Sequence, residues 1–211
     1  MIWTTIRISI RLIYRRIGTF LIGNVYWVLV SIPIVTIPAA TGALFYMVQR
    51  VVSEEEDNTP EWSGHKDFWV GLRLHWLRST LVGFLDLAVL IVLLVTLQFY
   101  LARPEEYLRW LAGPVLIFLV MWTGMQLFLF PLLIHFPDEP LVQLAKRAVL
   151  LVLGYPLYCL ALVLLLIALL AASIALAGPV LFLTFSLTAV IQTIALRVIR
   201  LEQLETKNRK R

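Results

Sequence analysis

The sequence predicts an all-α integral membrane protein: a polytopic bundle of six transmembrane helices, arranged as three hairpins, with an N-terminal interfacial amphipathic helix. Hydrophobic residues make up 61% of the 211 residues, and the mean hydropathy is +0.89; soluble domains usually contain about 45–50% apolar residues. Several apolar windows exceed about 18 residues, enough to cross the hydrocarbon core as a helix. The stretch CLALVLLLIALLAASIALAG (159–178) lacks the alternation of a membrane β-barrel.

Residues 1–16 predict the interfacial helix. Arg7, Arg11 and Arg15 recur every four residues, and isoleucines occupy another face, which is typical of a basic amphipathic helix lying on a membrane. Trp3 suits the headgroup depth. The alternative is a cleavable signal peptide, but the apolar stretch that follows, about 21 residues, is longer than a typical signal core.

The bundle is predicted to occupy residues 17–197. Its spans are expected at 17–37, 39–52, 81–101, 110–136, 148–171 and 179–197, with a cytoplasmic loop at 53–80 and a basic cytoplasmic tail at 198–211. The short segment 39–52 decides the topology. If it does not cross, twelve of the 18 basic residues lie outside. If it crosses, all but Arg103 and Arg109 lie inside, as the positive-inside rule requires, and both termini are cytoplasmic.

Prolines mark the expected turns. LAGPVLIF (111–118) and LAGPVLFL (176–183) open two later spans, as an internal repeat or by coincidence among apolar residues. Proline in a first helical turn sacrifices no hydrogen bond, so Pro38 and Pro114 are expected to open helices, with the chain turning at TIPAAT (36–41). Pro33 lies inside the first expected span and predicts a kink there.

Asp86 is the only carboxylate clearly inside an apolar run, where ionisable groups usually face the protein interior with a partner. Basic partners are expected among Arg50, Lys146 and Arg147, and polar ones among glutamines. Both a structural pair and a solute or proton site remain open.

Further intramembrane polar candidates are glutamines at comparable depth and one asparagine: Gln49, Gln126, Gln192 and Asn24. Such groups tie helices together or line a polar pathway.

No pattern predicts an enzyme. The acidic run 54–61 lacks the glycine and spacing of a calcium loop, and the histidines show no ligand spacing. Cys159 is the single cysteine. We therefore expect no catalytic, cofactor-binding or metal residues. The net charge of +5 comes from basic residues flanking the spans, so the expected partner is the lipid bilayer and not nucleic acid.

GNVYWVLVSIPIVTIPAATGALFYMVQRVVSEE (23–55) and KDFWVGLR (66–73) closely resemble the YesL-like family of bacterial membrane proteins, a domain without an assigned function. The matching positions are Asn24, Trp27, Pro33, Thr36, Pro38, Thr41, Phe68 and Arg73. The chain departs from the family pattern at Ile37, where a glycine often precedes the second proline.

The resemblance implies a non-enzymatic accessory role in carbohydrate or other solute uptake at the bacterial plasma membrane, with ABC-type sugar permease subunits as candidate partners. A small-solute transporter or channel acting on its own is the alternative. A membrane enzyme acting on lipid or polyprenyl substrates is a third, weaker reading. The oligomeric state and the solute are not readable from the residues.

The topology can be measured by cysteine labelling. A cysteine at position 58 should be shielded from an impermeant reagent in intact cells, whereas one at position 103 should react, because only the second position is expected outside. Labelling of position 58 from outside would contradict the six-span arrangement.

Overall fold

The computed structural model describes residues 1–57, 64–103, 105–175 and 181–209. Every regular element within them is helical, so the all-α prediction is confirmed. The elements are α1 (Ile2–Arg15), α2 (Ile17–Ser31), a 3-10 turn η1 (Ile34–Thr36), α3 (Ile37–Asp57), α4 (Gly64–Leu101), α5 (Glu106–Trp110), α6 (Ala112–His135), α7 (Leu141–Gly154), α8 (Pro156–Ala175) and α9 (Leu181–Arg209).

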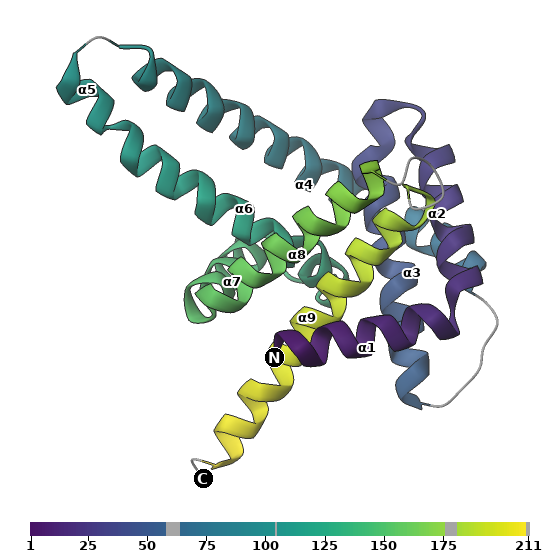
Figure 1. Cartoon of the computed structure of the whole chain (residues 1–211). Coiled ribbons are helices and arrows are strands. Elements are labelled where there is room, and N and C mark those ends of the chain that lie inside the picture. The colour runs from purple at the N-terminus through teal and green to yellow at the C-terminus, as the bar shows by residue number, and fades with distance from the viewer. Residues whose placement is uncertain (58–63, 104, 176–180, 210–211) are drawn as a thin grey trace.

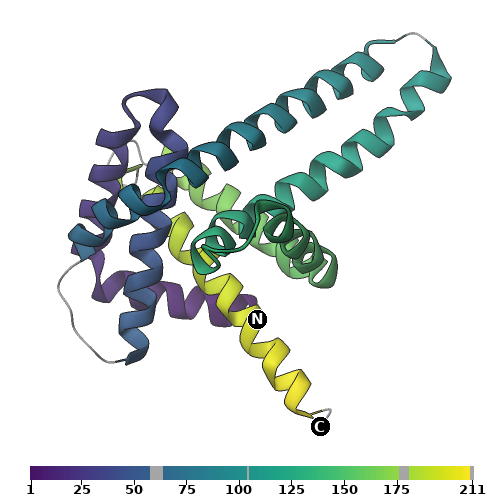
Figure 2. The ribbon, with the colours of Figure 1, turned by 180° about the vertical axis from the view of Figure 1, so that it is seen from behind.

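The long helices form three hairpins, α2–α3, α4–α6 and α8–α9, each with contacts between its two helices. In each hairpin, the end of the first helix and the start of the second point to one end of the molecule, and α1 and the α6–α7 turn lie toward the other (Figures 1 and 2). We call this second end the basic end; its arginines include Arg15, Arg50, Arg147 and Arg200. The α4–α6 hairpin slants away from the others as a separate arm.

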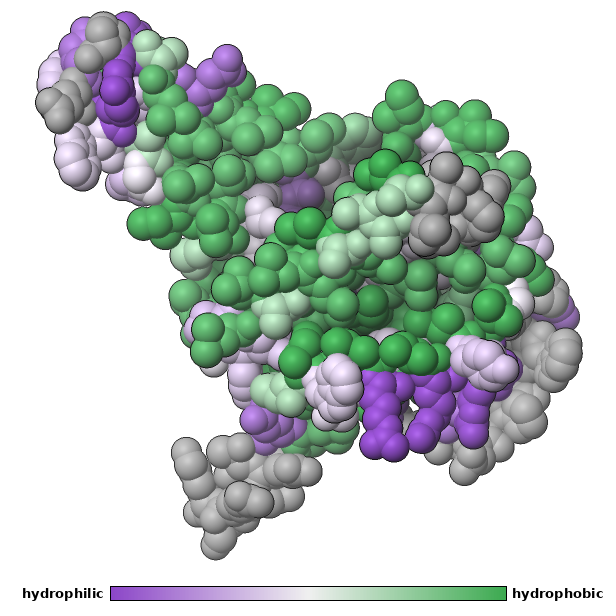
Figure 3. Space-filling view, in the orientation of Figure 1, coloured by the Kyte–Doolittle hydropathy of each residue, from purple (hydrophilic) through white to green (hydrophobic). Residues whose placement is uncertain are grey.

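Helix α1 lies across the basic end and packs on α9. It buries Thr5, Ser9 and Leu12 toward the bundle, and the Thr5 hydroxyl lies 2.7 Å from the hydroxyl of Tyr158 on α8. Hydrophilic side chains project from α1 below a broad hydrophobic band (Figure 3). This arrangement agrees with a helix lying at the membrane surface.

Within the described residues, five helices are long and apolar enough to span a membrane: Ile34–Glu55, Lys66–Leu101, Tyr107–His135, Pro156–Ala175 and Leu183–Leu204. The remaining expected span, 17–37, corresponds to α2, which has only 15 residues and therefore rises about 22 Å. The sequence predicted that the short span would be 39–52. In the structure α2 is the short helix instead, because the helix that contains 39–52, α3, has 21 residues and continues to Asp57.

Pro33 explains this correction. The sequence predicted a kink within the span 17–37, but in the structure the helix ends there. Helix α2 stops at Ser31, and Pro33 is extended, with φ −76° and ψ 110°. Proline has no N–H to continue the helical hydrogen bonds. The hydroxyl of Thr36 lies against the carbonyl oxygens of Val30 and Pro33, 2.6 Å from the latter. It thereby satisfies an orphan carbonyl at the end of α2. Pro38 lies in the first turn of α3, as expected.

Residues 148–171 do not form one helix, contrary to expectation. The helix breaks between Gly154, the last residue of α7, and Pro156, the first of α8, and Tyr155 between them has φ −134° and ψ 54°. Proline disfavours helical geometry in the residue before it and lacks the N–H that would continue α7. Helix α7 therefore stays at the basic end, and α8 alone is long enough to span.

Other boundaries differ because helices continue beyond the apolar runs. The segment 81–101 is the end of a 38-residue helix, α4, that begins at Gly64 inside the expected loop 53–80. The expected tail 198–211 is helical to Arg209 as the end of α9. Span 110–136 is α6, with Pro114 in its first turn. Much of the second repeat copy, 176–183, lies outside the described residues.

The closest packing joins α3 and α4, which share the most extensive helix–helix contact. Residues spaced four apart on α3 contact residues spaced four apart on α4, in the opposite chain direction. The contacts are Pro38 with Gly83, Gly42 with Ser79, and Tyr46 with His75 and also Gly71. A Cβ added at Gly42 would overlap the Ser79 side chain. Small residues thus let the two backbones approach, as in other membrane helix pairs.

Gly42→Leu should lower the free energy of unfolding in detergent by about 1–3 kcal/mol, because overpacking forces α3 and α4 apart. Gly113→Leu on α6 is the matched control, since a Cβ there meets nothing within 4 Å. Equal thermal unfolding temperatures for the two variants would contradict the close α3–α4 contact.

Candidate functional site: two polar clusters in the membrane bundle

The first cluster forms around Asp86, between α4 and α6. Its Oδ1 accepts a hydrogen bond of 2.7 Å from Trp122 Nε1 and another from Gln126 Nε2. Trp122 and Gln126 are one helical turn apart on α6, so both donors lie on one face and reach the same oxygen. Asp86 is half-buried.

Among the expected partners of Asp86, the structure thus selects an amide. The expected basic partners lie elsewhere: Arg147 pairs with Glu139 at 2.6 Å, and Arg50 and Lys146 are exposed. The sequence did not indicate Trp122 as a partner, because it lies 36 positions from Asp86 and no local pattern predicts that its N–H faces the carboxyl group. The donors of this cluster can stabilise the Asp86 carboxylate, and the cluster can hydrogen-bond a polar solute.

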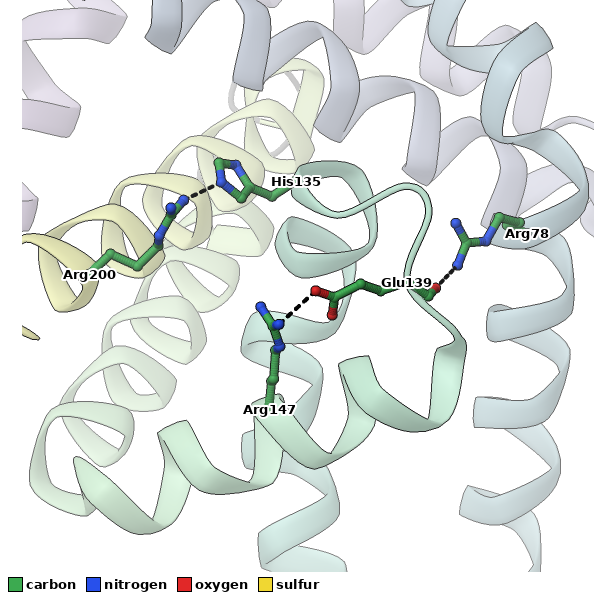
Figure 4. A network of polar contacts seen from close by, with 5 residues as sticks. All are labelled: Arg78, His135, Glu139, Arg147 and Arg200. Carbon is green, nitrogen blue, oxygen red and sulfur yellow. Dashed lines mark hydrogen bonds and ion pairs between the residues drawn. The ribbon is translucent and has the colours of Figure 1, made fainter.

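The second cluster lies at the basic end and joins α3, α6 and α9. His135 Nε2 contacts the Arg200 guanidinium, and its Nδ1 lies 3.0 Å from the side-chain amide of Gln49. Figure 4 shows Arg200 and His135 pointing toward each other from α9 and α6. A guanidinium only donates, so Nε2 must accept and the proton of a neutral ring stands on Nδ1. The Gln49 atom that faces Nδ1 is Nε2, so a flip of the amide is needed for its oxygen to accept that proton.

The turn between α6 and α7 is held from two sides next to this cluster. Arg78 of α4 donates to the backbone carbonyl of Glu139, and Arg147 of α7 pairs with its carboxylate (Figure 4). The ring of Phe136 lies under two guanidinium groups, 4.4 Å from that of Arg147 and 5.6 Å from that of Arg200. The basic residues here are therefore positioned by the protein and do not simply extend into solvent.

The structure does not unite the intramembrane candidates into one site. Gln49 and Gln126 belong to different clusters, and within the described residues half-buried Gln192 joins neither cluster. Asn24 is fully buried on α2, where its Oδ1 accepts from the backbone N–H of Ser186 on α9 at 3.2 Å. Asn24 therefore ties two helices together. His135 was not among the expected site residues, because the histidines in the sequence show no ligand spacing.

The residues of the family motif hold the α2–α3 hairpin. Trp27 Nε1 donates to Thr41 Oγ1 at 3.1 Å, and the Trp27 ring stacks on Phe185 of α9 with centroids 3.8 Å apart. Phe68 is fully buried near Tyr26, whereas Arg73 is exposed. Together with Thr36, Pro33 and Pro38 at the turn, these contacts stabilise the α2–α3 hairpin, which is a structural explanation for the motif.

The described residues contain no group of three His, Cys, Asp or Glu side chains that could hold a metal ion. Cys159 is a buried free thiol on α8.

Residues 20–97 match a family model described as "Protein of unknown function, DUF624". The chain is also 29% identical over 172 residues to a Bacillus subtilis (strain 168) protein described as "Uncharacterized protein YteU"; the alignment covers 80% of this chain and 74% of that protein. No solved structure matches. These findings confirm the resemblance to a family of bacterial membrane proteins without an assigned function.

Substitutions of Asp86 test the role of the first cluster. Asp86→Asn keeps an oxygen acceptor and should unfold like the wild type, whereas Asp86→Leu leaves the donors of Trp122 and Gln126 unpaired and should cost about 1–3 kcal/mol. Thr123→Val is the control, because Thr123 is exposed and its hydroxyl donates to Leu119 within α6. Thermal unfolding in detergent measures all three. Equal loss for Asn and Leu would indicate that the negative charge itself is needed.

Proposed function

We propose that this membrane protein of the DUF624 family is a non-enzymatic accessory subunit for solute uptake, which contacts another integral membrane protein through its α4–α6 arm. Carbohydrates are the proposed solute class and ABC-type sugar permease subunits the proposed partners, both taken from the family resemblance. The proposed location is the bacterial plasma membrane, with the basic end and both termini cytoplasmic.

The observation that carries this proposal is how little of the arm the chain itself covers. Only 6% of the most apolar window of α4 is buried, against 56% in α9. Large apolar side chains on both arm helices are exposed, among them Val92, Val95, Ile117 and Val120. Membrane helices associate by packing their side chains, so the exposed apolar side chains of this hairpin offer a surface for the helices of a partner.

The alternative is a small-solute transporter or channel, and the Asp86 cluster favours it. A half-buried carboxyl group inside a span, hydrogen-bonded by an indole and an amide, is the kind of group found along solute and proton pathways. The two functions differ in whether this chain moves solute alone.

Photo-crosslinking in native membranes tests the accessory role. A crosslinking amino acid at Val95 on the arm should capture a permease membrane subunit, because the arm is the proposed contact. Leu164 on α8 is the matched control position, since it is similarly exposed, at 58% against 60% for Val95. Identification of the products by mass spectrometry decides the result.

Capture of a permease subunit from Val95 and not from Leu164 would support the proposal. Products containing only lipid or this chain would contradict it. Sugar flux into liposomes that contain only the purified protein, abolished by Asp86→Asn, would establish the transporter instead.

A further inference from the structure

A cavity of about 230 Å³ opens at the basic end between α3, the end of α6 and α9. Its polar lining comes from Gln49, Ser53 and His135 on one side and from Thr193, Arg197 and Arg200 of α9 on the other. Among the described residues, the lining includes two guanidinium groups and no carboxylate. Guanidinium groups keep their positive charge at physiological pH.

The two arginines also connect this cavity to its neighbours. Arg197 lines a second cavity, of about 340 Å³, together with Arg11 and Arg15 of α1. The one carboxylate in that lining, Glu55, forms an ion pair with Arg15. Arg200 lines a third, of about 260 Å³, with Arg147. Guanidinium groups thus surround the inner part of α9 on several sides.

Thr193 provides an independent indication of a ligand. It lies four residues before Arg197, on the same face of α9, and is only 8% exposed. Its Oγ1 is buried and has no hydrogen-bond partner in the part of the chain that the structure describes. A buried hydroxyl without a partner costs about 1–3 kcal/mol. Thr193 lines the cavity, and a change of its χ1 rotamer that turned the hydroxyl toward the cavity would let an oxygen acceptor there remove that cost.

The rest of the wall is apolar and leads toward lipid. Val52, Pro131 and Leu196 line the interior, and the rim carries Leu201 and Leu204, which are 51% and 57% exposed. A water-soluble anion would leave these leucines bare, whereas an acyl chain would cover them. The lining is therefore amphipathic, with cations at one side and hydrocarbon at the other.

We propose that this cavity binds a phosphate group through Thr193, Arg197 and Arg200, and that the phosphate belongs to an anionic phospholipid whose acyl chain lies along Leu201 and Leu204. Guanidinium groups match phosphate geometry with paired N–H donors. Basic pockets between transmembrane helices on the cytoplasmic side are suited to anionic headgroups. The inference does not depend on the proposed uptake role.

Native mass spectrometry of the detergent-solubilised protein tests the site, with phosphatidylglycerol, phosphatidylcholine and water-soluble glycerol phosphate as probes. The wild type should retain phosphatidylglycerol over phosphatidylcholine by about tenfold or more. Both lipids carry a phosphate, but phosphatidylcholine adds a cationic choline, which the guanidinium groups repel. Arg197→Gln with Arg200→Gln should abolish the preference. Arg7→Gln with Arg50→Gln removes the same charge from exposed positions outside the cavity and should preserve it.

Thr193→Val separates binding from folding, in case the double arginine variant does not fold. Without lipid its thermal stability should equal or exceed that of the wild type, because valine buries no unpaired hydroxyl, while its retention of phosphatidylglycerol should fall several-fold. Equal retention of both lipids by the wild type, or an unchanged preference in the double arginine variant, would overturn the site. Retention of glycerol phosphate equal to that of phosphatidylglycerol would overturn the assignment to lipid.

Discussion

The two hydrophobic clusters of this protein share one helix, α9, which is buried along two neighbouring stripes. Ile191, Ala195 and Ile199 belong to the hydrophobic cluster of α6–α8, whereas Val190 and Ile194 belong to the cluster of α2 and α3. Both clusters therefore close on the same helix. Because α9 turns so much of its surface to protein, it can carry serine, threonine and arginine within its span, and these side chains make the contacts to α2 and line the cavity at the basic end.

Burial and apolar character vary in opposite directions among the spans. The spans of α3 and α9 are the least hydropathic and at least half buried, whereas those of α4 and α8 are the most hydropathic and the least buried. Lipid-facing helices need apolar side chains on all sides, while helices facing protein can use small and polar residues to approach closely and form hydrogen bonds. The region that matches the DUF624 family, residues 20–97, covers α2, α3 and nearly all of α4, where Gly42 and Trp27 make such contacts.

Composition and apolar runs were enough to predict the helical membrane class, and Pro38 and Pro114 located the starts of α3 and α6. Boundaries were less predictable, because Pro33 and Pro156 end helices where hydropathy continues without a break. The site was predictable only in part. Asp86 could be singled out by its charge, but its donor Trp122 comes from another helix, and the pairing depends on how α6 is rotated about its axis. For the same reason His135 could not be connected with Arg200.

The position of α9 in the chain has a consequence for biosynthesis. A ribosome makes α1 to α8 before α9, so the two clusters are both incomplete when α8 enters the membrane. About 160 residues separate Asn24 on α2 from its partner Ser186. At typical rates, their synthesis takes on the order of ten seconds or more. During this interval the earlier hairpins can insert and pack against each other, but insertion of the α8–α9 hairpin is the event that completes both clusters.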